Sequence, residues 1–155
     1  MPINRLMKGE LTAMHEKILG TALPSVMALA YLGDARHSLY VRRRLVDKGV
    51  AKSGELNELS LRYVTCEAQA EMLRIIEPHL LEDERDTYRR AAKSSHLNRP
   101  KRAHAADYRA ATGFEAVVGM LEWIGDEERL LLLLDIAHNA IDEKRKVSDK
   151  NDTEN

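Results

Sequence analysis

The sequence is short of the residues that several common protein classes need. Its 155 residues include a single cysteine, Cys66, which excludes an intrachain disulfide and suits a reducing compartment. The longest apolar run, residues 130–136, contains Asp135 and is far shorter than the ~20 residues that span a bilayer. Charged residues such as Lys8 and Glu10 interrupt the N-terminal segment, where a signal peptide needs an apolar stretch. We therefore predict a cytoplasmic protein with no membrane segment.

Glycine, proline and aromatic residues are also few. The chain has 8 glycines, 4 prolines and 5% aromatic residues, whereas 32% of its residues are charged. This composition, with no sustained strand alternation, favours an all-α fold over a sheet-rich or disordered chain. At this length we expect one domain over residues 1–143. A charged flexible tail without apolar anchors is expected over 144–155.

Apolar periodicity and helix-end signals divide the domain into several expected helices. Gly49 and Gly125 are the expected helix ends, and Ser53 and Asp126 are expected to cap the helices that follow them. The expected helices span about 10–19, 24–48, 53–77, 82–92 and 104–124, with a last helix after residue 126.

Two apolar surfaces have different expected roles. Trp123 and the Leu130–Leu134 run are expected to lie in the core. The second helix is apolar on nearly every side in its first half, which predicts a central position or a subunit interface. The expected dimer contact is its face formed by Val26, Met27, Leu29 and Ala30.

An acidic residue, Asp34, stands inside the apolar run Met27–Ala35. An isolated buried carboxylate costs several kcal/mol unless it is paired, hydrogen-bonded or bound to a metal, so its presence there favours a functional role. The preceding Gly33 costs about 1 kcal/mol relative to alanine inside a helix, and it allows another backbone to approach closely. The alternative is that Gly33 and Asp34 break the helix and that Asp34 caps a new one.

Glu115 is a second embedded acid, within the stretch Gly113–Val118. Its alternative role is that of a partly exposed side chain paired with Arg109 or Lys101. If the fold brings Glu115 and Asp34 together, two carboxylates suffice for Mg²⁺, which keeps several waters and is also held by substrate phosphate. So sparse a site predicts that the free protein binds Mg²⁺ only at roughly millimolar concentrations.

A basic segment precedes Glu115. Residues 85–109 contain eight lysines and arginines against two acids, a local charge of +6 in a chain of net charge −1. Arginine binds phosphates bidentately, and the scarcity of interleaved aromatics favours A-form duplex RNA over a stacked single strand. The alternative is a solvated charged loop. The candidate RNA-binding residues are Arg89, Arg90, Lys93, Ser94, Lys101, Arg102, Tyr108 and Arg109.

With these residues in view, the chain resembles the Mini-ribonuclease III family, which consists of a ribonuclease III-like nuclease domain alone. The order and separation of the matching pieces are more specific than any one piece. They are Leu-Ala-Tyr-Leu-Gly-Asp-Ala at 29–35, Tyr-Val-Arg at 40–42, Ala-Lys-Ser at 92–94, Pro-Lys at 100–101 and Tyr-Arg-Ala-Ala-Thr-Gly-Phe-Glu-Ala at 108–116.

The resemblance implies an all-helical homodimer that cleaves double-stranded RNA with Mg²⁺. It implies that Asp34 and Glu115 are the catalytic acids that hold the metal. It also implies that Ala30 and Thr112 occupy the two positions at which larger ribonuclease III enzymes carry two more acids. The implied substrate is the terminal stem of the large-subunit (23S) ribosomal RNA precursor, with a ribosomal protein that shapes this RNA as a further candidate partner. No separate double-stranded-RNA-binding domain is expected, so the basic segment must supply the affinity.

Three residues depart from the family pattern. Arg89 and Ala91 stand where glycine and asparagine are expected, and His104 replaces an acid. These departures bear on the RNA contacts and on the preferred cleavage sequence.

Two functions from other classes also fit the residues. A non-catalytic RNA-binding module for ribosome assembly would use the basic segment and treat Asp34 as a cap, and Asp34→Asn would leave it unaffected. A helical adaptor would have the charged loop as mere surface, and its binding would be insensitive to salt.

Overall fold

The computed structural model describes residues 23–95, 100–101 and 104–153, and all the regular structure in these ranges is helical. The predicted all-α fold is therefore confirmed, while the expected helix over 10–19 lies outside the described residues. The elements are α2 (Val26–Asp47), α3 (Ser53–Val64), α4 (Cys66–Ile76), a 3₁₀ turn η1 (Glu77–His79), α5 (Glu82–Ser94), α6 (Ala105–Ile124) and α7 (Glu127–Thr153).

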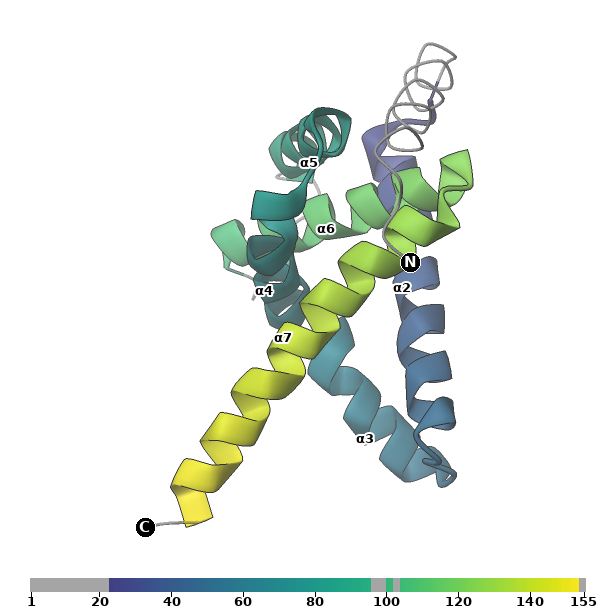
Figure 1. Ribbon diagram of the computed structural model, residues 1–155. Helices are drawn as coiled ribbons and strands as arrows, with labels where there is room; N and C mark the ends of the chain where they lie inside the picture. The colour runs from purple at the N-terminus through teal and green to yellow at the C-terminus, as the bar shows by residue number, and fades with distance from the viewer. Residues whose placement is uncertain (1–22, 96–99, 102–103, 154–155) are drawn as a thin grey trace.

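Helix α6 lies at the centre of the molecule, with α2, α4 and α5 packed around it (Figure 1). Its sequence is apolar or small on nearly every side, which suits a helix covered by others. Phe114, Val117 and Met120 are fully buried along it. Helix α7 crosses the molecule as one long helix and contacts α4 and α6 (Figure 1).

Several helix ends follow from the predicted signals. Gly49, which follows the C-cap Lys48 of α2, and Gly125, the C-cap of α6, have positive φ angles of 86° and 76°, which glycine adopts without a Cβ clash. Asp126 caps α7, since its Oδ1 accepts a hydrogen bond of 3.0 Å from the amide of Arg129. Ser53, by contrast, is the first residue of α3 and does not cap it, because Lys52 occupies the N-cap position.

The helix expected over 53–77 is divided at Thr65. The ψ of Thr65 is 157°, an extended value that ends α3, and its Oγ1 accepts a hydrogen bond of 3.3 Å from the amide of Ala68 to cap α4. Apolar periodicity continues across this point, because both helices turn an apolar face to the same core. The periodicity alone therefore did not reveal the break.

The structure corrects two expectations about α6 and α7. Trp123 is 58% exposed, and Leu131 and Leu132 are also in solvent, whereas Leu130, Leu133 and Leu134 are buried. A helix buries residues three and four apart, so only part of a continuous leucine run can face the core.

Residues 144–153, which belong to the expected charged flexible tail over 144–155, continue α7 as helix. Two side chains hold the start of this extension: Lys144 pairs with Glu71 at 2.5 Å, and Arg145 donates to the carbonyl of Arg62 at 2.6 Å. None of the described helices is long and apolar enough to cross a membrane.

Candidate active site

The crossing of α2 and α6 is closer than ordinary side chains allow. A Cβ on Gly33 would lie 1.7 Å from the carbonyl oxygen of Glu115, and one on Gly119 would lie 1.8 Å from the carbonyl oxygen of Leu29. Both positions therefore need glycine, and α2 runs through Gly33 as unbroken helix. The alternative in which Gly33 and Asp34 break the helix is wrong.

This crossing places Asp34 beside Glu115. Asp34 follows Gly33 and is exposed, while Glu115 is half-buried on α6. Burial, followed by the charge of Asp34, raises the pKa of the Glu115 carboxyl to about 8, and a hydrogen bond from Gln69 opposes this rise. The two acids therefore act on each other across the helix crossing. Neither Arg109 nor Lys101 is among the groups that shift this pKa, so nothing favours the alternative pairing.

The neighbouring positions carry no acid. Ala30 is buried one turn before Asp34, and Thr112 lies one turn before Glu115 with its hydroxyl donating to the carbonyl of Tyr108 at 2.8 Å. Within the described residues no cluster of three or more histidine, cysteine or acidic side chains forms a candidate metal site. The site is therefore a pair of carboxylates.

The chemistry of this pair fits a hard divalent cation. Carboxylate oxygens are the ligands that Mg²⁺ prefers, and one or two of them are enough when water and phosphate complete the coordination. Among the described residues, no lysine or arginine is one of the groups that shift the pKa of Glu115. A cation between Asp34 and Glu115 would relieve their repulsion and offset the cost of burying the Glu115 carboxylate.

The basic residues are divided between α5, α6 and the segment that joins them. Arg89, Arg90 and Lys93 are exposed on α5, as are Lys101 and, on α6, Arg109. Ser94 and Tyr108 are half-buried, and Arg102 lies outside the described residues. Since α5 packs directly on α6, this basic surface and Glu115 belong to neighbouring elements.

Not every arginine of the basic segment is available to a ligand. The Arg85 guanidinium turns back to donate to the carbonyls of Glu77 and Leu80, at 3.2 and 3.4 Å. Arg90 forms an exposed ion pair with Asp86, at 3.0 Å, which a phosphate can displace at little cost.

Gln69 is the site residue that sequence analysis missed. It comes from α4, is 2% exposed and bonds to Glu115. The signal that identified Asp34 was also present here, because Gln69 is a polar residue between two buried alanines, Ala68 and Ala70. A neutral amide is a weaker signal than a carboxylate, since its burial costs less.

The expected dimer face is partly wrong. Leu29 and Ala30 are 1% and 4% exposed, because the close approach of α6 at Gly119 covers them within one chain. They are not available to a second protomer. Val26 and Met27 remain half-buried, and Tyr31 of the same helix is 85% exposed.

Known proteins are similar to this chain in sequence. The family model for the Ribonuclease III domain matches residues 27–126. A Mini-ribonuclease 3 of Symbiobacterium thermophilum is 42% identical over 116 residues, which cover 75% of this chain and 89% of that protein. A Mini-ribonuclease 3 of Brevibacillus brevis is 40% identical over 108 residues, covering 70% of this chain and 81% of that protein.

The fold has a counterpart among solved structures. A crystal structure of a Fusobacterium nucleatum protein superposes with a TM-score of 0.68 at 25% sequence identity. The match covers 75% of this chain and 93% of the other.

Proposed function

The chain belongs to the Mini-ribonuclease 3 family, and from that premise we propose that Asp34 and Glu115 hold Mg²⁺ for the cleavage of double-stranded ribosomal RNA precursors. The protein is a ribonuclease III-type endoribonuclease, whose domain acts on double-stranded RNA. The observation that carries the site assignment is the helix crossing at Gly33, which sets the two carboxyl groups against each other.

Cleavage is hydrolysis of a phosphodiester bond. A water oxygen attacks phosphorus, the bond to the 3′-oxygen breaks, and the products carry a 5′-phosphate and a 3′-hydroxyl. Asp34 and Glu115 would hold the divalent cation, which when bound would supply Lewis-acid chemistry: it would acidify water and neutralise charge on the phosphate and the departing oxygen.

The chain's own residues have distinct tasks. Burial and the charge of Asp34 raise the pKa of Glu115 to about 8, so a cation held by the pair would favour the charged carboxylate that binds it. Asp34 is exposed and reaches solvent, where the substrate phosphate arrives. The rigid α2–α6 crossing fixes the separation of the two groups, so little reorganisation is needed when the cation binds.

The basic surface supplies affinity for the duplex. Arg89 and Lys93 extend from the exposed side of α5, and Arg109 extends from the start of α6. Contacts of this kind bind phosphates without reading bases, which suits recognition of duplex shape. Lys101, from the segment between the two helices, belongs to the same proposed surface. Arg102, which lies outside the described residues, remains a candidate RNA-binding residue by its sequence alone.

The assembly and the substrate complete the proposal. Two protomers related by a two-fold axis each cut one strand, which matches the pseudo-symmetry of an RNA duplex. Large side chains that remain exposed to solvent, such as Tyr31 and Trp123, are candidates for the dimer contact. The substrate is the terminal stem of the 23S ribosomal RNA precursor, shaped by a ribosomal protein, in the cytoplasm.

The test is cleavage of end-labelled double-stranded RNA by the wild type and Asp34→Asn, with Mg²⁺ and with EDTA. We expect Mg²⁺-dependent cutting that leaves 5′-phosphate ends and disappears in Asp34→Asn, while duplex binding is retained. Lys93→Ala is the matched control, because it removes a charge outside the acid pair and should weaken binding without abolishing cleavage. Undiminished cutting by Asp34→Asn would remove Asp34 from the mechanism, and binding without cutting by the wild type would favour the assembly module.

A further inference from the structure

Two histidines from distant parts of the chain meet in the core behind the acid pair. His37 of α2 and His138 of α7 are both 0% exposed, and their Nε2 atoms lie 2.9 Å apart. Aromatic rings enclose them: Tyr40 and Tyr63 lie 4.7 and 4.9 Å from the His138 ring, centroid to centroid, and Phe114 lies 5.0 Å from that of His37.

Both histidines are neutral. Burial lowers the pKa of His37 to about 4 and that of His138 to about 2, so neither ring is charged at neutral pH. A separation of 2.9 Å between the two Nε2 atoms then requires that one ring donates and the other accepts. The pair is therefore a directed hydrogen bond between two fixed tautomers.

Gln69 connects this pair to Glu115. Its Nε2 atom lies 3.4 Å from Nδ1 of His37, and its side chain also forms the hydrogen bond that lowers the pKa of the Glu115 carboxyl. Because its hydrogen bond lowers the pKa of Glu115, Gln69 donates to the carboxylate, and a glutamine donates only through its amide nitrogen. The two N–H groups of Gln69 therefore serve His37 and Glu115 respectively. His37 then accepts at Nδ1 and donates from Nε2 to His138.

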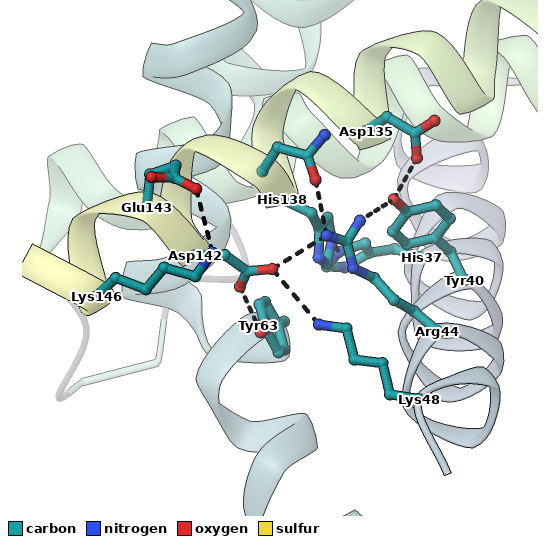
Figure 2. Close-up of polar contacts among 11 residues, drawn as sticks. His37, Tyr40, Arg44, Lys48, Tyr63, Asp135, His138, Asp142, Glu143 and Lys146 are labelled. Carbon is teal, nitrogen blue, oxygen red and sulfur yellow. Dashed lines mark hydrogen bonds and ion pairs between the residues drawn. The ribbon is translucent and has the colours of Figure 1, made fainter. Parts of the chain in front are cut away.

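Stability alone does not account for this chain of polar groups. Nδ1 of His138 is buried with no hydrogen-bond partner among the described residues, which costs free energy that an apolar residue would avoid. Further polar contacts lie near the two histidines: Tyr40 donates to Asp135 at 2.5 Å, and Arg44 pairs with Asp142 at 3.0 Å (Figure 2). These contacts join α2 to α7 and so fix the positions of His37 and His138 relative to each other.

We propose that Gln69 and His37 are positioning residues of the endonuclease: Gln69 orients the Glu115 carboxyl group toward Asp34, and His37, fixed by His138, orients Gln69. The proposal rests on the proposed function of Glu115. Groups that orient metal-holding side chains typically affect metal affinity or activity by 10–100-fold. Gln69 and His37 are 2% and 0% exposed, so RNA cannot reach them and their effect must pass through Glu115.

The first test compares Gln69→Met with the matched control Thr87→Val. Thr87 is also a buried polar residue facing α6, where its hydroxyl contacts the sulfur of Met120 at 3.1 Å, but it is not among the groups that shift the pKa of Glu115. For Gln69→Met we expect kcat to fall about tenfold and the Mg²⁺ concentration for half-maximal cleavage to rise about tenfold, with KM for duplex RNA unchanged. Thr87→Val should change stability while leaving all three quantities within twofold.

A second readout uses the metal-free protein. The ring ¹⁵N signals of His37 and His138 report their tautomers, and Gln69→Met should move the signals of both rings, whereas Thr87→Val should move neither. If Gln69→Met does not fold, His37→Leu and His37→Gln replace it. His37→Leu should reproduce the loss of kcat, and His37→Gln, which keeps a group that can bond to Gln69, should restore much of it.

The outcomes separate this proposal from the proposed function. If Asp34→Asn is inactive while Gln69→Met cleaves as the wild type does, the positioning proposal is overturned and the acid pair stands. Equal losses in Gln69→Met and Thr87→Val, or unmoved histidine signals, would also overturn it. If Asp34→Asn cleaves normally, the proposed function fails first.

Discussion

Glu115 should make the protein less stable as the pH rises, and Glu115→Gln should remove this dependence. The pKa of the Glu115 carboxyl is raised from 4.5 to about 8, so the folded state holds a proton that the unfolded state releases above pH 4.5. The stability associated with this proton is fully present below pH 4.5 and is lost as the pH rises toward 8.

The size of the effect follows from the shift. At about 1.4 kcal/mol per pKa unit, the interval from 4.5 to about 8 corresponds to about 5 kcal/mol. Glu115 is half-buried, so solvent screens part of this and we expect about 2 kcal/mol. Relative to the wild type, Glu115→Gln should therefore gain about 2 kcal/mol of stability between pH 5 and pH 9.

Urea unfolding of the wild type and Glu115→Gln at pH 5, 7 and 9 measures this difference. Groups that titrate equally in the two proteins do not contribute to the difference in their free energies of unfolding. Asp34→Asn is an informative companion, because it removes only the second cause of the shift and should reproduce part of the gain. Saturating Mg²⁺ should shrink the difference at pH 9. A gap between the wild type and Glu115→Gln that is the same at pH 5 and pH 9 would refute the reasoning.

Three further predictions concern the scaffold and the basic surface. Gly33→Ala should lower the free energy of unfolding by about 3 kcal/mol, because the new Cβ would overlap the α6 backbone. Gly54→Ala, in open space on α3, should raise it by about 0.5 kcal/mol. Equal effects of the two substitutions in thermal unfolding would contradict this reasoning. Glu84→Gln should lower the free energy of unfolding in urea by about 3 kcal/mol, because Glu84 is fully buried and pairs with Arg129 at 2.6 Å. A decrease of less than about 1 kcal/mol would contradict this expectation. Duplex RNA affinity measured against salt should give a log–log slope of about −4, as for about five phosphate contacts, and a flat response would exclude a phosphate-bound duplex.

The sequence predicted the acid pair because a carboxylate inside an apolar run is costly. Asp34 and Glu115 stand out by composition alone, and Gly33 beside Asp34 signals a close approach. What approaches Gly33 is a tertiary fact: the backbone of α6, some eighty residues later in the chain. Periodicity gives the faces of helices but not their partners.

The residues behind the acid pair could not be predicted for the same reason. His37 and His138 are 101 positions apart, and no local pattern signals that they meet. Gln69 lies on a third helix, so its link to Glu115 depends on how α4 packs against α6. Trp123 shows the converse, since a large aromatic residue at the end of a core helix can face solvent.

The central claim is that Asp34 and Glu115 together hold a divalent cation, and direct binding to the metal-free protein tests it most directly. Mn²⁺ binding, followed by water proton relaxation without RNA, should be weak in the wild type, at roughly millimolar concentrations, because two carboxylates form a sparse site. It should be lost in both Asp34→Asn and Glu115→Gln and retained in Lys93→Ala. Micromolar binding, or binding that survives either acid substitution, would contradict the account.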